Sequence, residues 1–179
     1  GKSCAQTLPM ADWTLNRLNK SSHALEVLDL MQRAADYVVL ETSRAPDMLF
    51  VKQFFDATPP GVEKTGLITF GMRQDSRLIG VVGVAQGYEF PTDWWVGLML
   101  LDPAMRGQGI GAAVFRALAE DARATGVLMI KLSVLTANPR ARRFWEKQGF
   151  EFHRPAPALP GSDGHDRVVL KYRTRKDRT

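Results

Sequence analysis

A glycine-rich segment, Arg106-Gly107-Gln108-Gly109-Ile110-Gly111-Ala112, carries the clearest chemical signal in this sequence. It lies where an apolar run typical of a strand gives way to apolar residues at helical spacing. Glycines at such a junction let the backbone turn tightly and leave its N–H groups exposed, next to the positive end of the helix dipole. Phosphate oxygens bind at places of this kind. We therefore predict a pyrophosphate site formed by the backbone of residues 106–112.

The same letters also fit the dinucleotide fingerprint G-x-G-x-x-A, through Gly107, Gly109 and Ala112. That motif needs an acidic residue about 20 positions later, at the end of the next strand. The corresponding stretch, residues 130–134, reads Ile-Lys-Leu-Ser-Val and contains no acid. An NAD-dependent redox activity is therefore a third-ranked alternative, which stabilisation by NAD would reveal.

A second motif follows the loop at a fixed distance. Asn138 is a good helix N-cap and Pro139 suits the first helical position, so a helix is expected from there to Gly149. The loop has the form R-x-x-G-x-G, and the segment from Asn138 to Phe150 has the form N-x-x-A-x-x-x-W-x-x-x-G-F. Together, the two segments resemble the acetyl-CoA motif and the following helix of the GNAT superfamily of N-acetyltransferases.

This resemblance implies acetyl-CoA as the cosubstrate and no metal. Backbone groups of Met99 and Leu101 would pair with the pantetheine arm like an added strand, and the Met99 N–H would polarise the acetyl carbonyl. Asn138 would reach the pantetheine, a role compatible with its capping one, while Ala141 and Arg142 would flank the nucleotide. The cofactor-binding residues implied in this way are Met99, Leu101, Arg106, Gly107, Gln108, Gly109, Ile110, Gly111, Ala112, Asn138, Ala141, Arg142 and Trp145.

The proton-transfer residues common in that family are missing. Its frequent tyrosine acid corresponds to Trp145, and the glutamate of several members corresponds to Trp95. If residues 94–101 form one regular strand, Trp95, Met99 and Leu101 share a face, and Asp93 joins them by the same period. We therefore name Asp93 as a candidate base acting through a water, with Glu89 as the second. The alternative is that Asp93 only completes a turn and Glu89 is solvated beside it.

The elements that must position these residues follow from the hydrophobic spacing. Helices are expected over residues 24–40, 48–55, 110–126 and 139–149, and strands over residues 67–72, 78–88, 94–101, 127–135, 150–153 and 168–172. This order predicts an α/β (α+β) domain. The resemblance adds a mixed, mostly antiparallel central sheet flanked by helices, with a splayed parallel strand pair at the cofactor site.

Composition restricts the class of protein. The chain has 179 residues, 45% of them hydrophobic, which suffices for one core, and we expect one domain over residues 11–173. Residues 1–10 are expected to form a flexible segment, either a leader or an added stretch, and residues 174–179 a solvated basic tail. The last nine residues carry +4 of the net charge of +5, so nucleic-acid binding is not expected. The single cysteine, Cys4, and the lack of a long apolar run favour a cytoplasmic protein that binds no membrane.

The sequence thus predicts an enzyme that transfers an acetyl group from acetyl-CoA to a primary amine of a small molecule or peptide, by direct attack in a ternary complex. The alternative is a degenerate acetyl-CoA-binding regulatory domain, because both of the family's usual proton-transfer residues are absent. A homodimer is left open, and the identity of the acceptor is not determined by the sequence.

Overall fold

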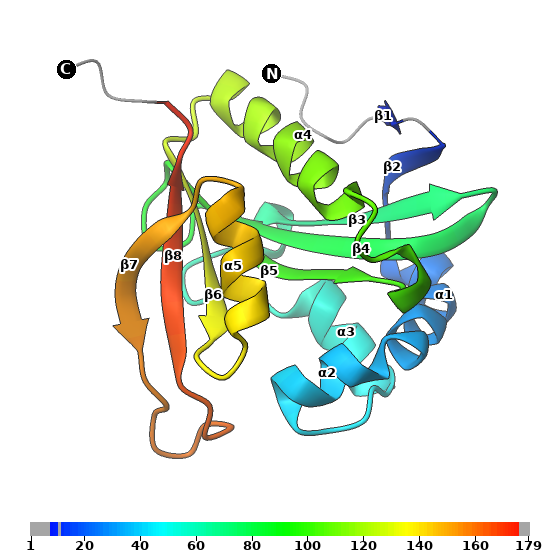
Figure 1. Ribbon diagram of the computed structural model, residues 1–179, viewed down its shortest axis with the longest axis horizontal. Coiled ribbons are helices and arrows are strands. Elements are labelled where there is room, and N and C mark those ends of the chain that lie inside the picture. Colours follow the sequence, from blue (N-terminus) through cyan, green and yellow to red (C-terminus); the bar gives the residue numbers. More distant parts are fainter. Residues whose placement is uncertain (1–7, 11, 176–179) are drawn as a thin grey trace.

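The computed structural model describes residues 8–10 and 12–175 of the chain (Figure 1). Its centre is a twisted sheet with the strand order β1-β2-β3-β4-β5-β6-β8-β7. The strands are β1 (Leu8–Met10), β2 (Trp13–Arg17), β3 (Leu67–Gln74), β4 (Arg77–Gln86), β5 (Asp93–Leu101), β6 (Met129–Leu135), β7 (Glu151–Ala156) and β8 (Arg167–Arg173). The helices are α1 (Lys20–Arg33), α2 (Ala35–Thr42), α3 (Met48–Asp56), α4 (Ile110–Ala124) and α5 (Pro139–Lys147), with short 3-10 turns η1 (Lys64–Gly66) and η2 (Pro103–Met105).

The expected fold class is confirmed. Neighbouring strands run antiparallel except β5 and β6, which are parallel and pair only over residues 93–96 and 129–132. Beyond these residues the two strands part (Figure 1). The sheet is therefore mixed and mostly antiparallel, with one parallel pair that opens like a V.

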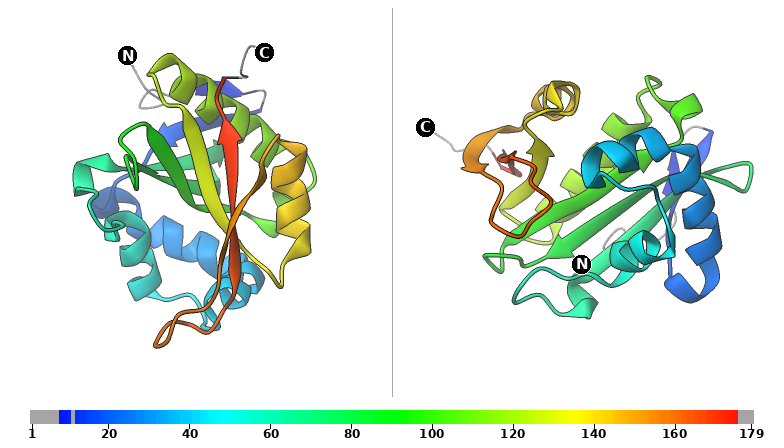
Figure 2. Two further views of the ribbon diagram at one scale, coloured as in Figure 1. Left: turned by 90° about the vertical axis from the view of Figure 1, so that its left-hand side faces the viewer. Right: turned by 90° about the horizontal axis from the view of Figure 1, so that it is seen from below.

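Helices cover the two faces of the sheet in separate groups. Apolar residues of α4 and α5 pack with Trp94, Val96 and Met99 on one face. Those of α1, α2 and α3 pack with Val81 and Leu100 on the other. Figure 2 shows the two groups on opposite sides of the sheet. We call these the α4/α5 face and the α1–α3 face.

The first helical region differs from expectation. The predicted helix over residues 24–40 is two helices, α1 and α2, because Ala34 between them leaves the helical conformation with φ −102° and ψ 31°. The N-cap is Asn19, whose side chain accepts a hydrogen bond from the Ser22 N–H at 2.8 Å. The apolar spacing continues across Ala34, which is why the periodicity does not reveal the break.

Strand β5 is not regular. Val96 pairs with Val84 and Leu98 with Gly83, so Gly97 is an extra residue that forms a β-bulge. The bulge reverses the alternation of side chains, as a one-residue slip does. Trp95 therefore lies on the α1–α3 side of the sheet with Ala85, whereas Met99 and Leu101 pack on the α4/α5 face. The expectation that these three residues share one face was wrong.

At both ends, packed structure reaches beyond the expected domain of residues 11–173. Leu8–Met10, assigned to the leader, forms β1 and pairs with β2. Thr174, assigned to the basic tail, is buried and donates a hydrogen bond from its hydroxyl to the Val127 carbonyl at 2.6 Å. Residues 1–7 and 176–179 lie outside the described part. None of the described helices is both long and apolar enough to cross a membrane.

Candidate active site

The V between β5 and β6 leaves an open backbone edge in the middle of the sheet. Gly97 is exposed although it lies within a strand, and Ser133 of β6 is exposed across from it, whereas Leu100 further along β5 is 1% exposed. The Asp102 N–H is directed to β4, where it bonds the Ile79 carbonyl at 2.8 Å. Because backbone groups alternate in direction along a strand, those of Met99 and Leu101 point to the open edge. An extended ligand can add there as a strand does.

The glycine-rich segment stands at one side of this opening. Gly107 and Gly109 have φ values of +76° and +80°, a region that favours glycine, and no atom lies within 4 Å of the position that a Cβ would take on either. Gly109 is also the N-cap of α4 and offers no side-chain cap. The first N–H groups of α4 therefore face open space unpaired, as an anion site requires. The local structure expected for this segment is present.

Side chains hold the segment in place from both ends. Asp102 accepts a hydrogen bond from the Ala104 N–H at 2.9 Å and is ion-paired with Arg33 of α1. Arg106 binds both carboxylate oxygens of Asp36 in α2, at 2.7 and 3.1 Å. A cavity of about 430 Å³ lies beside Asp102, lined by Arg33, Gln74, Arg77, Ile79, Asp102, Pro103, Ala104 and Met105. Its charged groups already pair with one another, so we regard it as part of the loop's support.

Helix α5 forms the wall on the other side of the opening. The Asn138 side chain accepts a hydrogen bond from the Ala141 N–H at 3.2 Å, so its capping role is present. Trp145 is 8% exposed, with its ring centroid 4.9 Å from that of Phe144 and 5.3 Å from that of Phe150. Trp145 is thus a core residue, and its predicted contact with the cofactor stays a prediction.

Gly111 brings α4 and α5 together. A Cβ on Gly111 would lie 3.1 Å from the Phe144 ring and 3.7 Å from the Met99 sulfur. The three residues therefore meet beside the open edge of β5. Sequence reasoning assigned Gly111 to the phosphate site and missed Phe144, for which the interhelical contact is the only signal.

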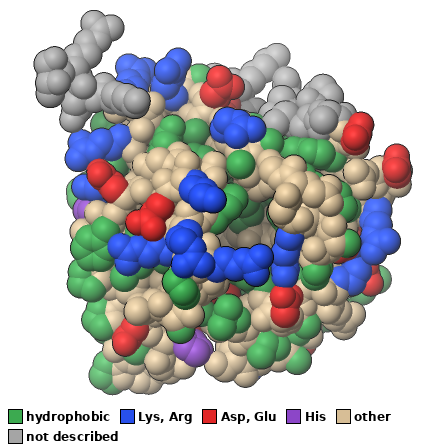
Figure 3. All heavy atoms as spheres, viewed as in Figure 1, with side chains coloured by type: hydrophobic (Ala, Val, Ile, Leu, Met, Phe, Trp, Pro, Cys, Tyr) green, Lys and Arg blue, Asp and Glu red, His purple; other side chains and the backbone are tan. Residues whose placement is uncertain are grey.

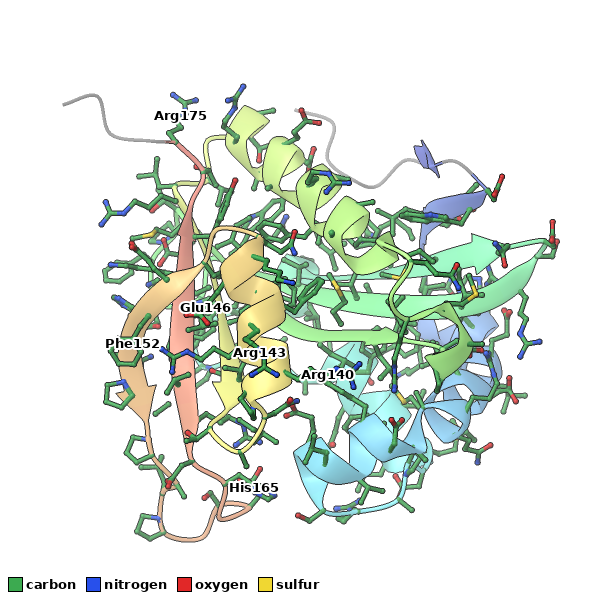
Figure 4. The ribbon with its side chains drawn as sticks, viewed as in Figure 1. Arg140, Arg143, Glu146, Phe152, His165 and Arg175 are labelled. Atoms are coloured by element: carbon green, nitrogen blue, oxygen red, sulfur yellow. The ribbon has the colours of Figure 1, made fainter. Side chains whose placement is uncertain are left out.

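The arginines of α5 divide into two sets. Arg142, expected to flank the nucleotide, lies over the Phe152 ring at 5.7 Å and 3.7 Å from the Glu146 carboxylate. Arg140 and Arg143 are exposed (Figure 4), and neither has an ion-pair partner in the part of the chain that the structure describes. Figure 3 shows a hollow between α5 and the turn before α4, with Lys and Arg side chains gathered around it. This edge of the opening suits a polyanionic ligand.

The candidate base Asp93 is buried, with an exposure of 3%, and lies on the same face as Trp95, as expected. Its Oδ2 is 2.7 Å from the Lys131 Nζ, although the angles are not those of a hydrogen bond and Oδ2 has no other partner. The Lys131 ammonium lies over the rings of Phe90 and Trp95, at 5.1 and 5.9 Å. Since Asp93 precedes Gly97 by four residues, about 13 Å of strand separates it from the bulge.

The second candidate, Glu89, lies in the turn between β4 and β5, in a left-handed conformation with φ +67°. Its carboxylate is paired with Arg154 of β7 at 3.3 Å. The structure therefore brings Asp93 and Glu89 to the same end of β5, each with a cationic partner. It brings neither next to the open edge.

A second group of charged residues, missed by sequence reasoning, lies where α2 meets the segment between β7 and β8. Arg167 donates to the Glu41 carbonyl at 3.3 Å and to the Asp163 carboxylate at 2.9 Å. The Ser43 hydroxyl and His165 Nε2 are 2.8 Å apart. Burial raises the pKa of the Glu41 carboxyl above its ordinary value, although Arg167 opposes the shift. Residues so far apart in the sequence leave no motif.

Comparison with known proteins identifies the fold. The chain matches the Acetyltransferase (GNAT) family over residues 29–150. No curated protein sequence matches the chain. An acetyltransferase from Thermus thermophilus superposes with a TM-score of 0.74 and 18% identity, covering 93% of this chain and 99% of the other.

Two further structures share the fold at similar distance. The ribosomal-protein-S18-alanine N-acetyltransferase from Escherichia coli gives a TM-score of 0.67 and 15% identity, covering 92% of this chain and 96% of that one. An aminoglycoside 6'-N-acetyltransferase complexed with coenzyme A gives 0.65 and 14%, covering 92% and 99%. The family match spans most of the chain. The parallel pair β5 and β6, which opens beside the start of α4 with Gly109 at its N-cap, agrees with it. The chain belongs to the GNAT acetyltransferase family.

Proposed function

We propose that the protein transfers the acetyl group of acetyl-CoA to a primary amine by direct attack in a ternary complex. The observation that supports this best is the open backbone edge of β5 at Met99 and Leu101, next to the unpaired N–H groups at the start of α4. A ligand with an extended amide-containing arm and a pyrophosphate matches both features at once. Acetyl-CoA is such a ligand.

In the proposed complex the backbone N–H groups of residues 107–112 bind the pyrophosphate, and the Met99 N–H stabilises the oxyanion that forms at the acetyl carbonyl. Asn138 and Trp145 remain proposed contacts of the pantetheine and thioester. Arg140 and Arg143, exposed on α5, are placed to attract the 3′-phosphate of the cofactor. The groups named here bind and orient the donor, and they leave the acceptor's proton to other residues.

In the proposed complex the acceptor approaches on the α1–α3 face, opposite to the donor. The bulge turns Trp95 and Leu98 toward the α1–α3 side, while Met99 turns toward α4 and α5. A donor bound along α4 and α5 therefore presents its thioester through the V to an amine on the other side. The acceptors proposed are small molecules or peptide ends, and the named acceptors of the two neighbours above, a ribosomal protein and an aminoglycoside, cover both classes.

A lysine-like amine with a pKa of about 10.4 is mostly protonated at neutral pH, and its deprotonation at pH 7 costs roughly 4.6 kcal/mol. Asp93 and Glu89 are the sequence-based candidates for this proton. Lys131 keeps Asp93 paired and the distance to the bulge requires a water relay, so these assignments stay proposals.

Thermal unfolding with CoA, acetyl-CoA and NAD tests the donor, and thiol release with a panel of amines tests the reaction. Stabilisation by CoA and acetyl-CoA, together with amine-dependent thiol release, is the expected result. Binding of acetyl-CoA without turnover of any amine would favour the alternative, a regulatory domain, which the tryptophans at positions 95 and 145 motivate. Stabilisation by NAD alone would overturn both.

A further inference from the structure

Two buried polar atoms on β5 have no hydrogen-bond partner. They are Asp93 Oδ2 and Trp95 Nε1, and no other buried side-chain nitrogen or oxygen is in this state among the residues that the structure describes. The two residues are 3% and 9% exposed. Burying a donor or an acceptor without a partner is unfavourable, so a ligand or a water usually completes such groups. Their occurrence two positions apart on one strand calls for a common explanation.

Both residues lie on the side of the sheet proposed for the acceptor. Trp95 packs in a cluster with Ala85 and Val169, whose members come from strands and from the turn before β5. Within the described part of the chain, α1, α2 and α3 contribute no residue to this cluster. Towards the V, Gly97 of β5 is exposed, and so is Ser133, which shares its face of β6 with Lys131. The cluster therefore adjoins an open part of the acceptor side.

Lys131 lies beside both unpaired groups. It is the register partner of Trp95 on the neighbouring strand. Its Nζ is 2.7 Å from Asp93 Oδ2 and 5.9 Å from the centroid of the Trp95 ring. The Phe90 ring, which is 57% exposed, lies 5.1 Å from the same nitrogen, and the Tyr88 ring meets Trp95 edge-on at 5.1 Å. The two unpaired atoms thus belong to one site, bordered by a lysine and two rings of the turn.

The hydrogen-bonding character of the two atoms restricts what can fill this site. The indole N–H only donates, and an ionised carboxylate only accepts. An ammonium group cannot accept from Trp95, and a carboxylate would be repelled by Asp93 and has no proton to donate to it. A hydroxyl group satisfies both atoms, because its oxygen accepts from Trp95 while its proton is donated to Asp93. Lys131 already supplies the charge opposite to Asp93, so a neutral group suits the site.

We propose that this site binds a hydroxyl group of the acceptor, and that the protein acetylates hydroxyl-bearing amines in preference to alkylamines of the same length. The proposal rests on the acetyl transfer proposed above and names the substrate class for it. One pleat repeat of about 6.6 Å separates Trp95 from Gly97 along β5. An amine a few bonds away from the bound hydroxyl therefore reaches the V. Trp95 determines specificity in this assignment and takes no part in bond making.

This role accounts for a tryptophan at position 95, where the resemblance would place a glutamate. A glutamate there would bring a second carboxylate close to Asp93 and would offer no donor. The indole instead adds an N–H and an apolar wall, and the bulge at Gly97 keeps it on the acceptor side.

The test compares linear amino alcohols of increasing length with the alkylamines in which a methyl group replaces the hydroxyl. For each pair we would measure kcat/KM with acetyl-CoA, and by calorimetry the affinity for the CoA-loaded protein. The wild-type protein should prefer the amino alcohol of the best length about tenfold or more, as expected for hydrogen bonds that include a charged partner.

Trp95→Phe keeps an aromatic ring and removes the N–H, so it should lose most of this preference. Trp94→Phe is the matched control, because the neighbouring tryptophan packs on the α4/α5 face, and it should keep the preference. Thermal unfolding verifies that both variants fold.

Equal values for the two amines of every pair in the wild-type protein would overturn the proposal and show that an ordered water alone fills the site, while acetyl transfer stands. An undiminished preference in Trp95→Phe, or an equal loss in Trp94→Phe, overturns it as well. Failure of the wild-type protein to turn over any amine overturns the proposed function, and the calorimetric comparison then still decides whether the site binds a hydroxyl.

Discussion

The Lys131 ammonium lies 2.7 Å from the Asp93 carboxylate, and both side chains are 4% exposed. Removing one member of a buried ion pair leaves an uncompensated charge, at a cost of about 3–5 kcal/mol. We expect Asp93→Asn to lower the free energy of unfolding by about this amount, and Asp93→Asn with Lys131→Met to recover most of it. Urea unfolding of both proteins measures the difference. Equal losses in the single and double variants would contradict an interaction between the two groups.

Loss of activity in Asp93→Asn alone is therefore ambiguous. The double variant is the fair test of Asp93 as a base, because it removes the carboxylate without leaving a buried cation. If it folds and keeps wild-type kcat/KM, Asp93 has no part in proton transfer.

Gly109 and Gly126 form a matched pair at the two ends of α4. Their φ values are +80° and +87°, and a Cβ on either would meet nothing within 4 Å. Alanine thus imposes similar backbone strain at both, about 1–2 kcal/mol. We expect Gly109→Ala to weaken acetyl-CoA binding about tenfold or more, because it disturbs the N–H groups that face the pyrophosphate, and Gly126→Ala to bind normally. Calorimetry measures the acetyl-CoA affinity of each variant, and equal affinities of Gly109→Ala and Gly126→Ala would refute the assignment of the glycine-rich segment to the pyrophosphate.

Gly111 plays a different role from Gly109, since its missing side chain makes room for Phe144. Gly111→Val should destabilise the fold by roughly 1–3 kcal/mol through overpacking. In a Phe144→Ala background the added cost should fall by at least about 0.5 kcal/mol, which a double-mutant cycle by urea unfolding measures. Additive effects would show that the two helices do not meet there. Gly111→Asp is a poor test of phosphate binding, because its side chain would disturb the packing against Phe144 as well as repel a phosphate.

Trp145 packs against Phe115, Phe144 and Phe150 in the core. Trp145→Ala should cost about 3–5 kcal/mol in the free energy of unfolding. Trp145→Tyr keeps an aromatic ring and adds a hydroxyl, so acetyl-CoA binding should be retained and acetylation should be equal or faster. Binding and turnover are measured separately for this variant. Normal binding with no residual turnover would show that the indole itself takes part in the reaction.

The exposed arginines of α5 offer a test of how the nucleotide binds. Replacing Arg140 and Arg143 by Gln should weaken acetyl-CoA binding about threefold to tenfold at low salt, because each is a surface charge near the proposed position of the 3′-phosphate. Binding of 3′-dephospho-CoA should change less. Arg123→Gln, in the last turn of α4 away from the opening, is the control. An equal effect on both ligands would place the 3′-phosphate elsewhere.

Local signals in the sequence predicted the parts of the site that depend on local backbone. The glycines at 107 and 109 and the Asn138 cap each need a residue type at one position, and each is present. The mixed, mostly antiparallel sheet and its parallel pair followed from the resemblance.

Long-range contacts account for what the sequence did not predict. The bulge at Gly97 arises from pairing with β4, so the period of β5 alone misplaced Met99 relative to Trp95. The contact of Arg167 with Glu41 joins residues that are 126 positions apart. No spacing rule connects such residues. The apolar spacing that continues across Ala34 likewise concealed α2 as an element of its own.

Because of the bulge at Gly97, the two faces of β5 have different proposed roles. In the proposed complex, elements on the α4/α5 face bind acetyl-CoA, whereas α2, on the α1–α3 face, and the segment between β7 and β8 that contacts its end lie on the side proposed for the acceptor. Substitutions on that second side can therefore alter which amine is accepted while the donor site stays intact. Evolutionary drift and laboratory selection for new acceptors should accumulate changes on that side. The bulge at Gly97 should be retained, because it keeps the two sides apart.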